Sequence, residues 1–279
     1  MGKKFFLGFS KYTALGIMLL IVGIPLIWII SIGFRVESEV LDILPTQFTT
    51  INYPKMMIEF NSWGGLSFAR MFGNSFLVTA VSLIGILMIS SLVAFAFSNY
   101  KFKFKEPLFI LFLLGMLIPA QVLLIPLFFL MKNLNLMGTY FTLILPYMAF
   151  NFPLGVLLLR SFFEKIPIEI KEAAKIDGAS DFRVFMRIIL PLSRPALATL
   201  TIVSFMAVWN EFLFALVFIR DDSMQTIPLI LNRMGFTRWG VDYGVYGSFI
   251  TITIIPVLII FLIFQRWFIA GLSAGAVKG

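Results

Sequence analysis

The sequence predicts an all-α membrane protein with six transmembrane helices, and three observations support this fold class. Of the 279 residues, 60% are hydrophobic and only 13% are charged, against about 25% charged in a soluble domain. The apolar residues form long runs, each sufficient for the roughly 20 helical residues that cross a bilayer core. Lys and Arg are concentrated in alternate connecting segments, which favours one orientation in the membrane.

Six runs satisfy the length requirement, and together they form a single transmembrane domain over residues 1–279. The predicted spans are residues 12–34, 71–98, 107–131, 134–159, 195–219 and 243–265. Only the fifth of them contains a charged residue, Glu211. The first has a longer apolar core than a signal peptide and no small-residue cleavage site after it, so we expect it to remain as a span.

The loop charges predict that both termini lie in the cytoplasm. An even number of spans places the two termini on one side, and that side carries 15 Lys and Arg residues against 7 on the other. Positively charged loops are retained in the cytoplasm. We therefore expect an outside loop at residues 35–70 and a large cytoplasmic loop at residues 160–194.

Composition and motifs exclude several functions. The chain has no Cys and no His, which removes disulfides, thiolate or imidazole catalysis and the usual transition-metal sites. It has no phosphate-binding loop, since no Lys is followed by Ser or Thr. We therefore predict no catalytic residue, no metal site and no cofactor in this chain, and a membrane protein of this composition is not a nucleic-acid-binding protein.

The 160–194 loop holds 12 of the 36 charged residues and has helical periodicity. Pro167 favours a helix start, and residues 168–177 are mostly good helix formers. Gly178 is placed for a left-handed helix stop, and Ser180 or Asp181 can cap a second helix.

The second helix should be amphipathic. Phe182, Phe185, Met186 and Ile189 have the spacing of one helical face, and Pro191 is expected to end the helix. Two interpretations remain open from periodicity. The pair of helices could anchor the loop to the membrane surface, or the small and acidic first helix could dock into a groove of a partner protein.

This loop resembles the EAA loop of the integral membrane subunits of binding-protein-dependent ABC importers. Glu-Ala-Ala is followed after three residues by Gly, and after nine more by Ile-x-Leu-Pro, at the spacing of that motif. The residues that the resemblance assigns to ATPase coupling are Glu172, Ala173, Ala174, Asp177, Gly178, Ile188, Leu190 and Pro191.

Further matches indicate the second permease subunit of maltose-type and multiple-sugar importers. They lie at Asn74–Ser75, Pro119-x-Gln121, Trp209–Phe212 and the C-terminal segment from Gln265 onward. In that subfamily the C-terminal tail also reaches the ATPase, which implies a second contact at Gly275, Ala276, Val277, Lys278 and Gly279. Composition alone favours a frayed, Gly-rich terminus instead.

The resemblance implies a permease subunit that forms half of a sugar translocation path in the cell membrane of a prokaryote. Its expected partners are a second homologous permease, two ATPase subunits that bind ATP and Mg, an extracytoplasmic sugar-binding protein and membrane lipid. In the family the EAA helices sit in a cleft of the ATPase. Glu172 would then provide an anionic contact and Gly178 the tight turn.

Glu211 is the one acid within a span, where a charge costs about 2.5–3.5 kcal/mol on insertion scales. With Trp209 and Asn210 it could line the translocation path, because aromatic faces and amides suit sugars. A hydrogen-bonded packing contact to the partner permease is the interpretation that the sequence favours.

Three alternatives to a sugar importer stay open. The same kind of importer could carry a polyol or a glycerol-phosphate-like solute, although the spans contain no Lys or Arg at depth. A stand-alone secondary transporter would need ion-coupling acids in several spans, and only Glu211 is available. A membrane-embedded enzyme would lack paired carboxylates.

Overall fold

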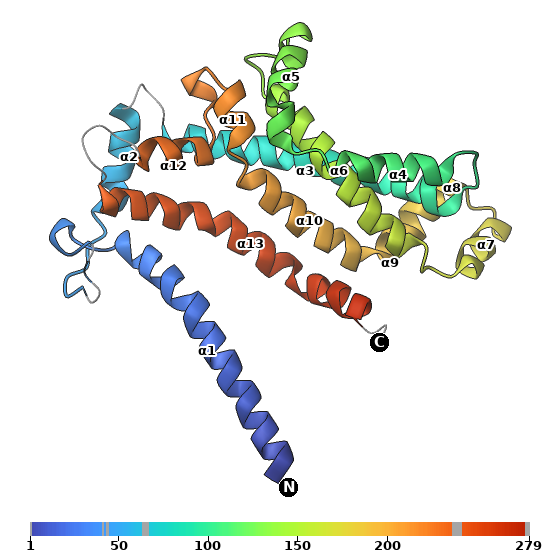
Figure 1. Ribbon diagram of the computed structural model, residues 1–279, viewed down its shortest axis with the longest axis horizontal. Helices are drawn as coiled ribbons and strands as arrows, with labels where there is room; N and C mark the ends of the chain where they lie inside the picture. Colours follow the sequence, from blue (N-terminus) through green and yellow to red (C-terminus); the bar gives the residue numbers. More distant parts are fainter. Residues whose placement is uncertain (1, 41, 43–44, 63–66, 236–241, 277–279) are drawn as a thin grey trace. The chain divides into compact units, whose positions relative to one another are not determined.

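The computed structural model describes residues 2–40, 42, 45–62, 67–235 and 242–276 (Figure 1). Within these ranges every regular element is a helix, apart from one isolated antiparallel bridge between Arg35 and Phe48. The chain forms two compact units. The first contains residues 1–68 and 230–256, and the second contains residues 69–229 and 257–279.

The first unit contains helix α1 (Gly2–Ile32), the short 3₁₀ helix η1 (Glu37–Glu39) and α2 (Asn52–Ser62). The buried side chain of Asn52 organises the chain that follows α1, because its Nδ2 donates to the carbonyl oxygens of Gly33 at 3.1 Å and Arg35 at 2.8 Å. These bonds give a partner to two carbonyl groups that lie after the end of α1, outside any helix.

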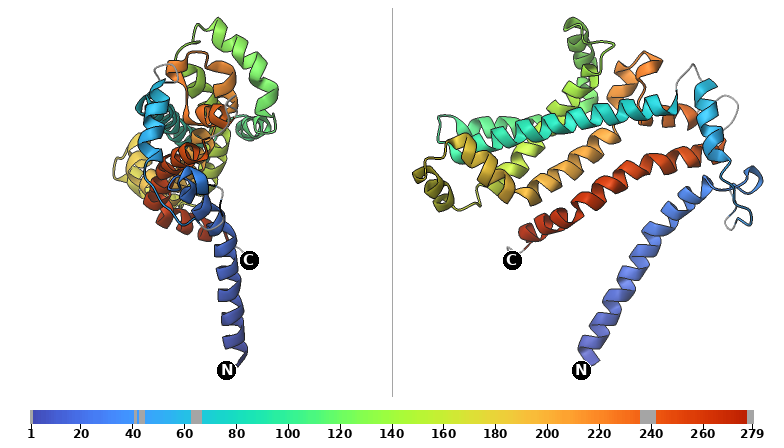
Figure 2. Two further views of the ribbon diagram at one scale, coloured as in Figure 1. Left: turned by 90° about the vertical axis from the view of Figure 1, so that its left-hand side faces the viewer. Right: turned by 180° about the vertical axis from the view of Figure 1, so that it is seen from behind.

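The second unit carries the residues that the sequence assigned to function, and Figure 2 shows its helices from two further sides. The helices are α3 (Phe68–Asn99), α4 (Lys105–Gly115), α5 (Ala120–Asn133), α6 (Phe141–Phe163), α7 (Ile168–Ile176), α8 (Asp181–Val184), η2 (Phe185–Ile189), α9 (Leu190–Leu192), α10 (Arg194–Trp209), α11 (Leu213–Phe218), η3 (Asp222–Met224), α12 (Ile227–Gly235) and α13 (Tyr243–Ala276), the last two of which extend into the first unit. Its core is built from apolar side chains of α3, α6, α8, η2, α10 and α11.

The predicted third span, 107–131, is two helices and not one. Helices α4 and α5 meet at an angle of 98°, with residues 116–119 between them. Pro119 explains the break, because it has no N–H to donate and it disfavours helical geometry in the residue before it. Among the described residues five helices are long and apolar enough to span a membrane, and the bent pair would make a sixth.

The predicted fifth span, 195–219, is also interrupted. Helix α10 ends at Trp209, and α11 begins at Leu213. The three intervening residues include Glu211, so the one acid of the predicted spans lies where the helical hydrogen bonds are broken. The backbone N–H groups that the break leaves without helical partners are available to bond its carboxylate.

Gly155 of α6 provides a test of helix packing. A Cβ added there would lie 2.7 Å from Cβ of the buried Ser90 on α3, whereas a Cβ at Gly73 would meet nothing within 4 Å. Overpacking of this kind costs about 1–3 kcal/mol, while alanine in an open helical position gains about 0.5–1 kcal/mol over glycine. We expect Gly155→Ala to lower the thermal unfolding midpoint in detergent and Gly73→Ala to leave it unchanged or raise it. Equal midpoints for the two variants would contradict this packing.

Candidate coupling loop and membrane cavity

The 160–194 loop has the two helices and the turn that the sequence predicts. Helix α7 covers Ile168–Ile176, and Gly178 has a φ of +78°, a conformation that favours glycine. The Ser180 side chain caps α8 by accepting the backbone N–H of Arg183 at 3.4 Å. The chain therefore reverses at Gly178 and starts a second helix immediately.

The second helix differs from the prediction, because Pro191 does not end it. The chain stays helical through Leu192 and passes through a π-helical turn at Phe185–Ile189. Pro191 cannot donate to the carbonyl four residues earlier, and its ring crowds that position. The wider turn accommodates it: the N–H of Leu190 bonds the carbonyl of Phe185, five residues earlier.

The apolar residues of this helix form two rows and not the single face that the sequence predicted. Phe185 and Ile189 are buried in the core, whereas Phe182 is 66% exposed and Met186 is 48% exposed. Residues four apart in a helix lie above one another. Phe182 and Met186 therefore form one row, and Phe185 and Ile189 form the row next to it. The protein core covers one row only, and the other row is a surface.

The predicted coupling residues are divided between surface and core. Exposed positions are Glu172, Ala173, Asp177, Gly178 and Pro191, whereas Ala174, Ile188 and Leu190 are partly buried. The three partly buried side chains pack against the core of the second unit. Ile176 adds an apolar surface position that is 87% exposed. Helix α7 therefore presents carboxylates and three isoleucines, Ile168, Ile170 and Ile176, outward while Ala174 holds it close to the core.

A polar contact that the sequence did not reveal connects this loop to α3. Asp181 accepts a hydrogen bond from the hydroxyl of Tyr100 at 3.0 Å and pairs with Nζ of Lys175 at 2.8 Å. These hydrogen bonds, the one from Lys175 foremost, hold the pKa of Asp181 below its usual value. The carboxylate is therefore ionised at neutral pH. Tyr100 lies 81 residues from Asp181 in the sequence, so no local pattern indicates the pair.

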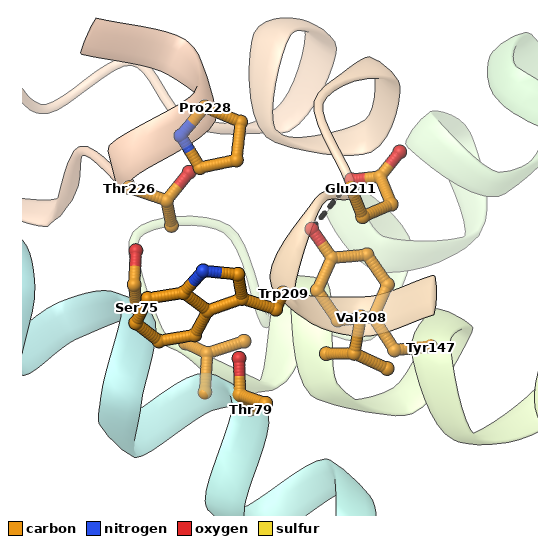
Figure 3. Close-up of a pocket in the computed structure, with 9 residues that line it drawn as sticks. Ser75, Thr79, Tyr147, Val208, Trp209, Glu211, Thr226 and Pro228 are labelled. Carbon is orange, nitrogen blue, oxygen red and sulfur yellow. Dashed lines mark hydrogen bonds between the residues drawn. The ribbon is translucent and has the colours of Figure 1, made fainter. Parts of the chain in front are cut away.

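Two of the three predicted path residues lie at a cavity in the second unit, shown in Figure 3. Trp209 and Glu211 line the cavity, but Asn210 does not: its side chain is exposed and donates to the Met206 carbonyl. The remaining lining residues come from α3, α6, α10 and the start of α12. They are Ser75, Val78, Thr79, Tyr147, Val208, Thr226 and Pro228.

The Glu211 carboxylate accepts hydrogen bonds from backbone N–H groups at the break between α10 and α11. Its Oε1 accepts the N–H of Phe214 at 2.9 Å, and its Oε2 accepts the hydroxyl of Tyr147 at 2.5 Å and the N–H of Ala215 at 3.4 Å. The carboxylate thus caps the first turn of α11 and joins it to α6. This arrangement gives the acid a packing role within this chain.

The segment after α11 is fixed across the same cavity by α3. Asn74 donates to the carbonyls of Ser223 at 2.9 Å and Gln225 at 3.0 Å, and Ser75 Oγ accepts the N–H of Ile227 at 2.8 Å. The cavity volume is about 10 Å³, which is room for roughly one water molecule. A sugar cannot enter unless these elements move apart.

The predicted contact of the C-terminal tail falls partly outside the described residues and stays a prediction. Gly275 and Ala276 are the last residues of α13, and Val277, Lys278 and Gly279 lie outside the described residues. Across the described part of the chain, no group of three or more carboxylates, His or Cys could hold a metal ion.

A family model and the related sequences indicate the same protein family. Residues 86–274 match the model of the family described as binding-protein-dependent transport system inner membrane component. The chain is 36% identical to an arabinooligosaccharides transport system permease protein of Halalkalibacterium halodurans, over 91% of each chain. It is 34% identical to a trehalose/maltose transport system permease protein of Thermococcus litoralis, over 94% of each chain.

A solved structure shares the fold. One chain of a bacterial ABC transporter involved in the import of the acidic polysaccharide alginate superposes with a TM-score of 0.80 at 24% sequence identity. The match covers 96% of this chain and 98% of that chain. The helices described above therefore have the arrangement of an ABC importer subunit.

The turn at Gly178 can be tested with two substitutions. No atom lies within 4 Å of an added Cβ, so only the backbone conformation opposes a side chain. A left-handed residue costs roughly 1–2 kcal/mol unless it is Gly, or to a smaller extent Asn. We expect Gly178→Ala to increase amide hydrogen exchange across residues 168–184, and Gly178→Asn to increase it less. Equal exchange in the two variants and the parent protein would contradict the strained turn.

Proposed function

The chain belongs to the family of binding-protein-dependent transport system inner membrane components, and from this membership we propose that it is a permease subunit of an ATP-driven importer that carries a sugar or oligosaccharide inward. It is a multi-pass inner membrane protein and a transport subunit, not an enzyme. Its helices would form half of the translocation path, and a second, homologous permease would form the other half.

The observation that carries the proposal is the geometry of the coupling loop, residues 160–194. Helix α7 is anchored through Ala174 and turned by Gly178, and it leaves Glu172, Ala173 and Ile176 exposed. A lone membrane-surface helix would present bulky apolar and basic side chains. Helix α7 exposes three isoleucines, Ile168, Ile170 and Ile176, together with two carboxylates and the small Ala173. This combination suits an apolar groove with a basic wall on a partner. We assign that groove to a separate ATPase subunit, with Mg and ATP bound there.

The choice of a sugar rests on relatives and on the cavity. The relatives named above transport arabinooligosaccharides and trehalose or maltose. The cavity is lined by hydroxyls, two aromatic rings and one carboxylate whose oxygens are already bonded, and no basic residue is among its lining. Such a lining suits a neutral polyhydroxylated solute better than a phosphorylated one. An extracytoplasmic binding protein would deliver this solute.

The proposed topology has six spans, with α4 and α5 together as the third and both termini in the cytoplasm. It places the coupling loop on the cytoplasmic side with the ATPase. The segment from α11 to α12, next to the cavity, then lies toward the outside, where solute arrives. Glu211 and Trp209 would reach the solute only when the cavity opens.

Co-purification of the tagged chain tests the proposal. We expect a complex that contains a second permease and an ATPase, and we expect Glu172→Lys to release the ATPase or to abolish stimulation of ATP hydrolysis by transport. The reason is that the substitution places a cation against the basic wall of the groove. Glu169→Lys, one turn earlier on the same exposed surface of α7, is the matched control and should retain most of the coupling.

Two results would contradict the proposal. The chain could purify without an ATPase and still transport solute, which would indicate a secondary carrier. Alternatively, the two charge reversals could have the same effect, which would show that net charge alone matters and not a specific contact at Glu172.

A further inference from the structure

Helix α3 differs from the other membrane-length helices of the described chain in being uninterrupted by proline. It runs for 32 residues, a length of about 48 Å at 1.5 Å per residue. Proline occurs within each of the other membrane-length segments, and two of these are also broken, at residues 116–119 and 210–212. Proline and missing helical bonds are two of the usual causes of bending, so α3 is the one continuous, proline-free connection among these described helices.

The C-terminal end of α3 contacts the coupling loop. Tyr100 follows the last residue of α3, and its hydroxyl donates to Asp181 at the start of α8. Asp181 in turn pairs with Lys175 on α7. In Figure 1 the end of α3 and the helices α7 and α8 are found at the same end of the second unit. A movement of α7 can therefore reach α3 without passing through α6 or α10.

The N-terminal part of α3 contacts the cavity. Asn74 and Ser75 bind the backbone of residues 223–227, and Ser75 and Thr79 line the cavity beside Thr226. Asn74 also accepts the hydroxyl of Tyr140 at 2.7 Å, so its amide is bonded on both sides. A shift of α3 must therefore displace the 223–227 segment or break several buried hydrogen bonds.

We propose that α3 is a rigid connection that transmits movement of the coupling loop to the cavity, with Tyr100 as the positioning residue at the loop and Asn74 and Ser75 as the contacts at the cavity. This inference rests on the proposed function, because it assumes that an ATPase moves α7. It adds a specific route to that function: the ATPase would open the cavity by displacing residues 223–228 through α3.

The absence of Cys from the chain makes a direct test possible. Thr226→Cys places a thiol in the cavity, at a position that is 5% exposed. In the purified complex with the partner permease and ATPase, the rate of modification by a water-soluble thiol reagent is measured with and without ATP plus vanadate. We expect ATP plus vanadate to raise this rate, because the proposed movement opens the cavity. The rate with nucleotide divided by the rate without it then reports how much movement reaches the cavity.

Two further changes in this background isolate the route. Tyr100→Phe removes only the hydroxyl, and we expect it to reduce the ratio by about two- to thirteenfold, the effect of one lost hydrogen bond. Met88→Gly with Ile89→Gly softens the middle of α3 at two exposed side chains, and should reduce the ratio further. The matched controls are Tyr243→Phe, on another exposed tyrosine, and Met88→Ala with Ile89→Ala, which removes the same side chains without loosening the helix.

The outcomes separate this inference from the proposed function. A complex that lacks an ATPase would refute the proposed function and with it the inference. If the complex assembles and imports solute but nucleotide does not change the rate at residue 226, the inference alone is wrong. The inference alone is also wrong if Tyr100→Phe, and Met88→Gly with Ile89→Gly, each give the same ratio as the matched control.

Discussion

The structure depends on one constraint: a backbone N–H or carbonyl group inside a bilayer must find a partner within the protein. At the interruptions beside the cavity, polar side chains meet that requirement, whereas at the break between α4 and α5 the N–H groups of residues 116–118 bond backbone carbonyls of α4. Glu211 caps α11 after the break that follows Trp209, and Asn74 and Ser75 bind the extended residues after η3. The few polar residues of the spans are therefore the reason that non-helical segments persist beside the cavity.

This constraint links the two functional regions of the chain. The coupling loop combines a buried side, which fixes its position, with an exposed side that has no cover within the described chain. The cavity is closed by segments that side chains hold and not by continuous helices. Both regions are in contact with α3. Under the proposed function, energy would enter at the loop and a path would open at the cavity.

The sequence predicted features with local causes and missed those with distant causes. Helix α7, the turn at Gly178 and the cap at Ser180 follow from helix propensity and backbone conformation at single positions. The π-helical turn before Pro191 and the 98° bend before Pro119 were not predicted, because a proline in an apolar run fits either a tolerated kink or a break. The contact between Tyr100 and Asp181 depends on tertiary packing, which one sequence does not reveal. The role of Glu211 was left open between the translocation path and a packing contact to the partner permease. Its three partners within this chain, Tyr147, Phe214 and Ala215, were not predicted.

The central claim is that the exposed side of α7 docks against a separate ATPase. Its most direct measurement is photo-crosslinking in membranes with a photoreactive amino acid at Ile176, which is 87% exposed, and in parallel at Ile125 on α5, which is 71% exposed. The account predicts an adduct of this chain with the ATPase from residue 176 and none from residue 125. Failure to capture the ATPase from residue 176, or equal capture from both positions, would contradict it.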